Sequence, residues 1–244
     1  MNPLSSQQRA GLQPLAWLVH AFTASGAVLA FLALMAIIEE DWDRALLWLL
    51  VALAVDGLDG SLARWARVKE RAPSIDGATL DLIIDYLNYV FVPAVLIWRA
   101  ELVPPSLAPA LAAGILISSL YNFTREDLKT EDNYFRGFPA LWNVVAFYLF
   151  VARAGGDVGA VAVCVLAALT FAPVHFIHPF RVRDFGRWPP LLACLWAAST
   201  AALLWPDWPG EARAAWLLLS LGTAALLLAL GLLRTARGRL PEGG

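Results

Sequence analysis

The stretch VDGLDGSLARWARVKERAPSIDGATLDLIIDY, residues 55–86, carries two pairs of aspartates next to long apolar segments. Asp56 and Asp59 are three residues apart, and Asp81 and Asp85 are four apart, so each pair lies on one face of a helix. The polar residues between the pairs predict a short loop, so the two helices form a hairpin. Such a hairpin brings both acidic faces together and places four carboxylates in one pocket.

The apolar surroundings make these aspartates costly unless something binds them. A charged Asp at the centre of a bilayer costs about 2.5–3.5 kcal/mol, so the carboxylates must face water or protein. Bound divalent cations would offset their mutual repulsion, and ligand sets made only of oxygen suit Mg²⁺, Mn²⁺ or Ca²⁺. The alternative is that the aspartates pair with loop arginines or cap a helix, as we expect for Asp76.

The whole chain has the composition of a membrane protein. Of its 244 residues 59% are hydrophobic and 16% charged, against about 45–50% and 25% in soluble domains. The excess lies in blocks long enough to cross a bilayer. We therefore predict an all-α polytopic membrane protein, a single membrane domain over residues 1–244 with about eight transmembrane helices. The expected spans are 13–38, 42–63, 78–99, 105–123, 138–153, 157–179, 188–205 and 212–233.

The positive charges predict how these spans are oriented. If the amino terminus is cytoplasmic, fourteen of the 18 Lys and Arg residues fall on the cytoplasmic side, as the positive-inside rule requires. Both termini and the 64–77 loop then face the cytoplasm. Four tryptophans lie at the opposite edges, as an interfacial belt would: Trp42, Trp98, Trp205 and Trp208. The net charge of −2 gives no indication of a nucleic-acid partner.

Small residues accompany the acidic pairs. Gly57, Gly60, Ala63 and Gly77 flank them. Small residues permit close helix packing, or they allow a phosphate-bearing group to approach the backbone. On the second interpretation Arg64, one turn after Gly60, is placed to hold phosphate by a forked hydrogen bond.

The order of these residues resembles a family signature. D-G-L-D-G-S-L-A-R (56–64), followed by Gly77, Asp81 and Asp85, resembles D-x-x-D-G-x-x-A-R, a gap and G-x-x-x-D-x-x-x-D of the CDP-alcohol phosphotransferase family. The gap, Trp65 to Asp76, is longer than usual and resembles a bacterial branch that makes phosphatidylcholine. Three further stretches resemble that branch: H-A-F-T-A-S-G (20–26), F-R-G-F-P-A-L-W-N (135–143) and H-P-F-R-V (178–182).

The resemblance implies a fold and a reaction. The fold would be a six-helix catalytic core over about residues 13–180, with two additional transmembrane helices over about 185–235. The hydroxyl of choline would attack the lipid-bound phosphate of CDP-diacylglycerol, and CMP would leave. The resemblance further implies two Mn²⁺ or Mg²⁺ ions, a homodimer and a location in the bacterial inner membrane, with the active site facing the cytoplasm.

The resemblance also assigns roles to residues. Metal ligands would be Asp56, Asp59, Asp81 and Asp85, with Asp85 also the general base. Cytidine diphosphate would be held by Gly60, Ala63, Arg64, Gly77, Thr23 and His20. His20 stands where the family often has Asn, and a polar contact between helices is an equally good interpretation of this residue.

Choline is a quaternary ammonium ion, and such cations are recognised by aromatic faces. Tyr89 lies one turn beyond Asp85 on the same face, with Asn88 beside it, and we expect these residues to contact choline. Tyr121 and Trp142 are further candidates, although aromatic residues at such places also simply pack or lie at the membrane interface.

Two polar groups lie further along the chain. Glu126, Asp127, Glu131 and Asp132 either attract the choline cation or belong to a solvated loop. His178, Arg181 and Arg183 are candidates for holding a lipid phosphate at the membrane interface. The two arginines also follow from the positive-inside rule alone.

Two other functions remain open from the sequence. The acceptor could be a different alcohol, such as serine or glycerol phosphate. A cation or choline transporter would also carry intramembrane acids, but transporters place them near the midplane of related halves. Here the acids cluster at one edge of unrelated halves, which favours the enzyme.

Overall fold

The structure is a computed structural model that describes residues 13–205 and 210–238. The described chain is mostly helical and divides into two compact units, Met1–Leu96 and Ile97–Gly244. The predicted belt residue Trp208, and the chain ends to which the orientation prediction refers, lie outside the described residues.

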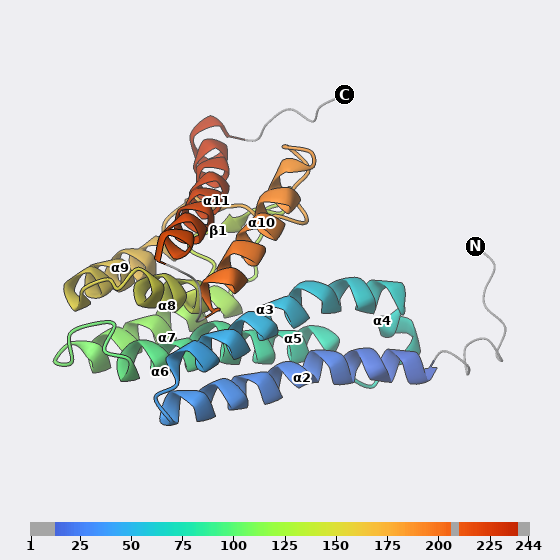
Figure 1. Cartoon of the computed structure of the whole chain (residues 1–244). Coiled ribbons are helices and arrows are strands. Elements are labelled where there is room, and N and C mark those ends of the chain that lie inside the picture. Colours follow the sequence, from blue (N-terminus) through green and yellow to red (C-terminus); the bar gives the residue numbers. More distant parts are fainter. Residues whose placement is uncertain (1–12, 206–209, 239–244) are drawn as a thin grey trace. The chain divides into compact units, whose positions relative to one another are not determined.

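The first unit is built around a long antiparallel helix pair. Helices α2 (Gln13–Ile38) and α3 (Trp42–Trp65) lie side by side (Figure 1). The short α4 (Val68–Arg71) leads to α5 (Gly77–Tyr86), which packs on α2. One π-helical turn, η1 (Leu87–Phe91), then joins α5 to α6 (Val92–Arg99).

Aspartates cap the N-termini of two of these helices. The Asp41 carboxylate accepts the backbone N–H of Arg44 at the start of α3. Asp76 accepts hydrogen bonds from the backbone N–H groups of Ala78 and Thr79 at the start of α5, and from the Thr79 hydroxyl. The bond from the Thr79 hydroxyl contributes most to holding the pKa of Asp76 below its usual range, and the two backbone bonds add to it. The predicted cap at Asp76 is confirmed, and α5 therefore begins at Gly77, one turn before Asp81.

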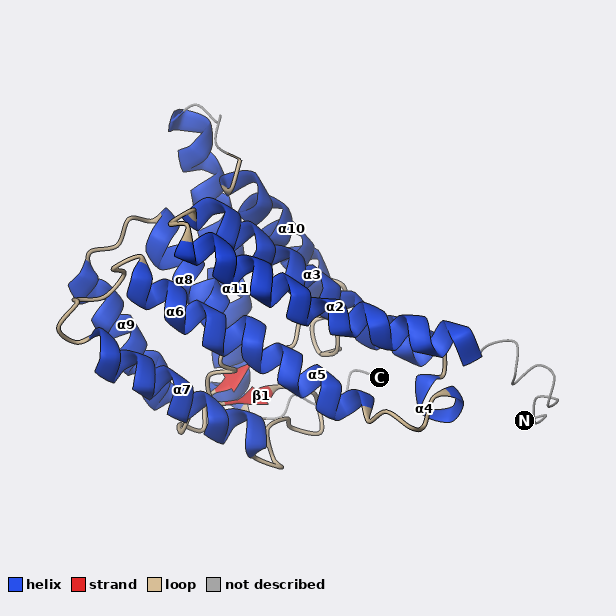
Figure 2. Cartoon of the chain, turned by 90° about the horizontal axis from the view of Figure 1, so that it is seen from below, coloured by secondary structure: helices blue, strands red, loops and turns tan. Residues whose placement is uncertain are grey.

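The second unit contains helices and one pair of short strands. Its elements are α7 (Ala108–Thr124), β1 (Phe135–Arg136), α8 (Trp142–Val151), α9 (Gly156–Leu169), β2 (His175–Phe176), α10 (Trp188–Leu203) and α11 (Gly210–Arg237). The strands pair antiparallel, Phe135 with Phe176 and Arg136 with His175 (Figure 2). Helix α7 packs on α9, and α10 packs along α11.

Within residues 13–205 and 210–238, four helices are long and apolar enough to cross a membrane: Pro14–Ile38, Trp42–Trp65, Gly77–Arg99 and Gly210–Arg237. The shorter apolar helices α7, α8, α9 and α10 stand where the sequence predicted the other four spans. All eight predicted positions are therefore helical, but half of the helices are shorter than a bilayer-spanning helix of about 20 residues.

Two predicted spans were too long at the ends that face the strand pair. The expected 138–153 and 157–179 are helical only over Trp142–Val151 and Gly156–Leu169. The residues outside these helices form hydrogen bonds between the two segments instead. The Gly137 N–H donates to the Val174 carbonyl (2.7 Å), and the Phe138 N–H donates to the Leu169 carbonyl (3.1 Å). Gly137 has a φ of +79°, which a residue with a Cβ rarely adopts.

The end of α11 is tied to the loop before β1 by a buried ion pair. Arg234 Nε donates to Asp132 Oδ2 at 2.8 Å, and the two side chains are only 10% and 13% exposed. The Arg234 guanidinium also lies over the Tyr134 ring, 5.6 Å from its centre. The Thr235 hydroxyl accepts the backbone N–H of His175 (2.8 Å). The final helix is therefore joined to the strand pair within the second unit.

Candidate active site

The hairpin of α3 and α5 brings three of the predicted aspartates together. Asp56 on α3 and Asp81 and Asp85 on α5 each offer a carboxylate oxygen, and these oxygens all lie within 4.8 Å of one another. All three side chains are partly buried. They line a small cavity inside the first unit with Asp59, Thr23, Gly26, Asn88, Tyr89 and neighbouring apolar residues.

Asp59 lines the same cavity but is held by another helix. It is 6% exposed, and its Oδ2 accepts a hydrogen bond of 2.8 Å from the hydroxyl of Thr23 on α2. No oxygen of Asp59 belongs to the cluster of three. The predicted pocket therefore holds three neighbouring carboxylates and a fourth that is bonded to α2.

Tyr89 and Asn88 connect the π-helical turn to this cavity. The Tyr89 hydroxyl donates to Asp56 Oδ2 at 2.6 Å, and Asn88 Nδ2 donates to the backbone carbonyls of Gly26 and Ile84, each at 3.0 Å. Both side chains are buried. The sequence placed Tyr89 beside Asp85 but did not indicate the bond to Asp56, because the π-helical turn alters the helical register.

The predicted nucleotide residues spread along α2, α3 and the start of α5. His20 is buried against Gly77, where an added Cβ would lie 3.2 Å from the His20 ring. Its Nε2 is buried without a hydrogen-bond partner among the described residues. Gly60 and Ala63 are partly buried, and the exposed Arg64 donates to the Ser61 hydroxyl (3.0 Å).

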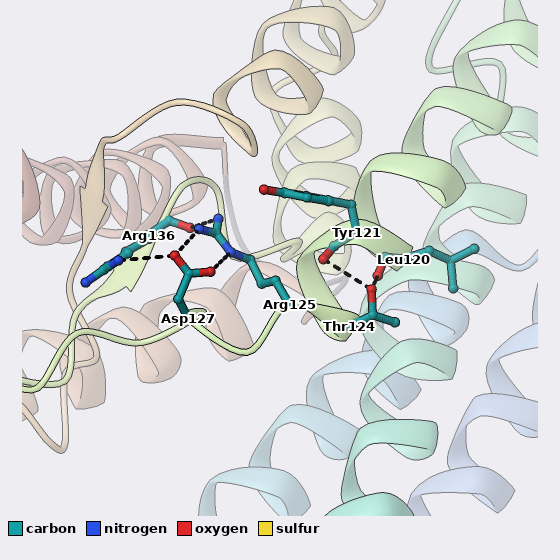
Figure 3. Close-up of polar contacts among 6 residues, drawn as sticks. All are labelled: Leu120, Tyr121, Thr124, Arg125, Asp127 and Arg136. Carbon is teal, nitrogen blue, oxygen red and sulfur yellow. Dashed lines mark hydrogen bonds and ion pairs between the residues drawn. The ribbon is translucent and has the colours of Figure 1, made fainter.

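Tyr121 and Trp142, the other two choline candidates, belong to the second unit. Trp142 is fully buried, and its indole N–H donates to the Ser119 hydroxyl (2.8 Å). Tyr121 is 44% exposed and packs on Phe171. The Arg125 guanidinium already lies 5.4 Å from the centre of the Tyr121 ring (Figure 3). Among the four candidates, only Tyr89 and Asn88 line the carboxylate cavity.

The acidic loop of the second unit is organised by ion pairs. Arg125 binds both oxygens of Asp127, at 2.7 and 2.9 Å, and Arg136 binds the same carboxylate at 3.1 Å (Figure 3). The hydrogen bonds from Arg125 lower the pKa of Asp127 to about 2. Asp132 is paired with Arg234, as described above. Two of the four loop acids are thus bound to arginine within the protein.

The three candidates for lipid phosphate lie after β2. Arg181 and Arg183 are exposed, whereas His178 is partly buried and stacks on Phe135 with ring centres 5.6 Å apart. The His178 carbonyl accepts the N–H groups of Arg181 and Val182 in a turn. The two arginines are therefore accessible, while the His178 ring packs against β1.

Gly26 explains how α2 can approach α5 at the cavity. A Cβ at this position would lie 2.5 Å from Ile84 Cγ2 and 3.6 Å from Asn88 Nδ2. We expect Gly26→Ala to push α2 away from α5, at a cost of about 1–3 kcal/mol, and to lower activity through the Thr23–Asp59 contact. Thermal unfolding measures the loss of stability, and the initial rate of the enzymatic reaction measures the loss of activity. The control is Gly114→Ala, where no atom lies within 4 Å of an added Cβ; equal losses in both variants would contradict the explanation.

The site contains the ligands that a divalent cation requires. Its donors are carboxylate oxygens, which suit hard divalent ions, and three of them are close enough to share an ion. Clustered carboxylates on apolar helices could therefore bind a metal ion, as the sites of metal-assisted group transfer do. Residues 17–174 match the sequence profile of the CDP-alcohol phosphatidyltransferases. The chain belongs to this family, whose members use divalent metal ions.

Individual bacterial relatives extend the similarity beyond the motif. The chain is 49% identical to a phosphatidylcholine synthase of Pseudomonas aeruginosa over 78% of this chain and 79% of that protein. It is 43% identical to one of Mesorhizobium japonicum, over 79% and 72%, and 36% identical to one of Legionella pneumophila, over 96% and 94%. With its apolar helices, the chain is a multi-pass membrane protein.

Proposed function

We propose that this protein is a CDP-diacylglycerol–choline phosphatidyltransferase, an enzyme that makes phosphatidylcholine and releases CMP. The observation that carries the proposal is the cluster of Asp56, Asp81 and Asp85 on two apolar helices. The relatives named above support choline as the acceptor, because each is a phosphatidylcholine synthase.

In the proposed reaction, the hydroxyl oxygen of choline forms a bond to the phosphorus atom that carries diacylglycerol. The bond from this phosphorus to the oxygen of CMP breaks, and CMP leaves with the bonding electron pair. Asp85 takes the proton of the choline hydroxyl as general base. Its position beside Asp56 and Asp81 supports this role, because the base then lies next to the carboxylates proposed to hold the metal ions.

Two Mn²⁺ or Mg²⁺ ions complete the proposed site. Such ions stabilise the charge that develops on the attacked phosphate and on the leaving group. The residues proposed to hold them are Asp56, Asp59, Asp81 and Asp85. The bond from Thr23 holds Asp59 Oδ2 toward α2 within the same cavity.

We further propose that the donor lies along the small residues of the motif. Gly60, Ala63 and Gly77 leave room for the cytidine diphosphate, while Arg64, Thr23 and His20 contact its phosphates. The unbonded Nε2 of His20 supports this assignment. The choline contacts are proposed at Tyr89 and Asn88, which line the carboxylate cavity. Arg181 and Arg183 are proposed lipid-phosphate contacts, with His178 supporting their loop.

The topology of the protein is also part of the proposal. All eight apolar helices cross the bacterial inner membrane, both termini are cytoplasmic and the active site faces the cytoplasm; the distribution of Lys and Arg supports this orientation. Residues of about 13–180 form the catalytic core, and about 185–235 form two additional helices of the same domain. The Arg234–Asp132 ion pair supports the attachment of the last helix to the preceding sequence, because it joins α11 to the loop before β1 within the second unit. The homodimer remains a prediction from the family resemblance.

A reconstituted assay tests the reaction and its acceptor together. Purified protein given CDP-diacylglycerol, labelled choline and Mn²⁺ is expected to form labelled phosphatidylcholine and CMP in equal amounts. A chelator should abolish the reaction, and added Mn²⁺ or Mg²⁺ should restore it, because the carboxylate site requires the ions.

The other outcomes discriminate the alternatives. Use of serine or glycerol phosphate in place of choline would refute the acceptor and leave the reaction type standing. Movement of choline or cations into sealed liposomes, with no CMP released from CDP-diacylglycerol, would instead favour a transporter and overturn the enzymatic proposal.

A further inference from the structure

The π-helical turn η1 interrupts the long helix that carries Asp81 and Asp85. It covers Leu87–Phe91 between α5 and α6, and Asn88, Tyr89 and Val90 within it are all buried. A π-helical turn holds more residues than an α-helical turn and occurs frequently at functional sites. Here the turn begins two residues after Asp85, so it determines which side chains of the following segment face the carboxylate cavity.

The side chains of this turn bond to two other helices. Asn88 Nδ2 donates to the Gly26 carbonyl on α2 and to the Ile84 carbonyl on α5. Tyr89 is 6% exposed, and its hydroxyl donates to Asp56 Oδ2 on α3 at 2.6 Å. Asn88 therefore fixes the turn against α2, while Tyr89 extends from it to one carboxylate of the cluster.

The hydrogen bond from Tyr89 to Asp56 counteracts the electrostatic repulsion within the carboxylate cluster. Three neighbouring carboxylates repel one another, so each gains by turning away unless a donor or an ion holds it. Residues that bind metals are commonly oriented by a second group, and loss of that group typically costs about 10–100-fold in metal affinity or activity. A hydroxyl suits this task at Asp56, because it donates a hydrogen bond to the carboxylate and adds no further negative charge.

A parallel contact exists at the other aspartate of α3. Thr23 donates its hydroxyl to Asp59 Oδ2 at 2.8 Å. Both acids of the first pair, Asp56 and Asp59, are therefore held by hydroxyl donors from elements other than their own helix. One donor lies on α2, which precedes the motif in the sequence, and the other lies on η1, which follows it.

We infer that Tyr89 is a positioning residue that holds Asp56 in the orientation that binds a divalent ion, and that the π-helical turn exists to place it there. The inference rests on the proposed function only in that the cluster binds such ions; it does not depend on choline as the acceptor. Tyr89 acts through Asp56 and needs no contact of its hydroxyl with substrate.

Tyr89→Phe tests this role because it removes the hydroxyl and keeps the aromatic ring. Mn²⁺ binding to the purified protein, without donor or acceptor, is measured by the electron paramagnetic resonance signal of free Mn²⁺. We expect the dissociation constant to rise about 10–100-fold. CMP release should fall at limiting Mn²⁺ and recover at high Mn²⁺, whereas the KM for choline should stay unchanged, because the ring that faces a quaternary ammonium ion is still present.

Tyr148→Phe is the matched control. Its hydroxyl is also bonded inside the protein, since it accepts Trp196 Nε1–H (2.8 Å) and contacts the Ser220 side chain (2.8 Å) in the second unit. This variant should bind Mn²⁺ like the unchanged protein. Asp56→Asn provides a second test, because in that background Tyr89→Phe should weaken Mn²⁺ binding no further than Asp56→Asn alone.

Several results would overturn the inference. Tyr89→Phe could bind Mn²⁺ with unchanged affinity, it could raise the KM for choline instead, or its effect could persist in full when Asp56 is already Asn. If Tyr148→Phe weakened Mn²⁺ binding equally, the effect would reflect the loss of any buried hydroxyl. If the unchanged protein did not bind Mn²⁺, the cluster would not be a metal site and the inference would be refuted. Use of another acceptor with intact Mn²⁺ binding would refute choline alone.

Discussion

Asp85→Asn is expected to lower the rate of CMP release by about two to four orders of magnitude, the usual contribution of a general base, while CDP-diacylglycerol still binds. Asn keeps the size and polarity of the side chain but cannot accept a proton from choline. Asp85 lies with Asp56 and Asp81 in one cluster, so its loss acts at the reacting atoms. Initial rates at saturating choline and Mn²⁺ measure the effect, and binding of labelled CDP-diacylglycerol shows that the donor site is intact.

Asp76→Asn is the appropriate control for this experiment. Asp76 is an exposed carboxylate that begins the same helix and accepts the N–H groups of Ala78 and Thr79. Asn caps helices about as well as Asp, so this variant should keep nearly normal turnover. Nearly normal turnover in Asp85→Asn would instead exclude Asp85 as the base. A similar loss in both variants would mean that α5 has shifted.

The second large effect is expected on stability, at the ion pair that joins α11 to the loop before β1. Arg234→Met should lower the free energy of unfolding by about 3–5 kcal/mol, because it leaves the buried charge of Asp132 unpaired. Burial of Asp132 raises its pKa, but the hydrogen bond from Arg234 and its other bonds outweigh burial, so the pKa is lowered overall. The contribution of Asp132 is therefore present at neutral pH and is lost as the pH falls through its lowered pKa.

Thermal unfolding in detergent, followed by tryptophan fluorescence, measures this effect. Arg44→Met is the control, since Arg44 and Asp41 form an ion pair whose side chains are 46% and 44% exposed, and exposed pairs contribute about 0–1 kcal/mol. Replacing both members of the buried pair, as Arg234→Met with Asp132→Leu, should restore most of the lost stability. If Arg234→Met unfolded at the same temperature as the unchanged protein, the ion pair would not anchor α11.

The sequence predicted the elements of the site better than their connections. The spacing of the aspartates and the short 65–76 loop predicted the α3–α5 hairpin, because helical periodicity and loop length are local properties. The bond from Thr23 to Asp59 joins residues 36 positions apart. Nothing in the spacing of α2 indicates which of the two aspartates it contacts, so the sequence left the Thr23–Asp59 contact undetermined.

The same distinction explains the errors in the fold. Apolar composition predicted helices at all eight positions, but 138–153 and 157–179 were too long. Residues 135–138 and 169–176 bond to each other, and pairing of two apolar segments so far apart has no local signal. The Arg234–Asp132 bond spans 102 residues. Each partner alone resembles an ordinary charged residue at the edge of a membrane helix, so neither indicated the ion pair.

Because of the π-helical turn at Leu87–Phe91, the number of residues in this segment cannot change without altering the site. Deleting one residue there would let the backbone continue as a regular α-helix, because a π-helical turn holds more residues than an α-helical turn, and the side chains within the turn, including Asn88 and Tyr89, would change direction. The segment would remain as apolar as before and would still insert into a bilayer. Insertions and deletions in these five residues are therefore expected to destroy activity even though the topology of the protein survives.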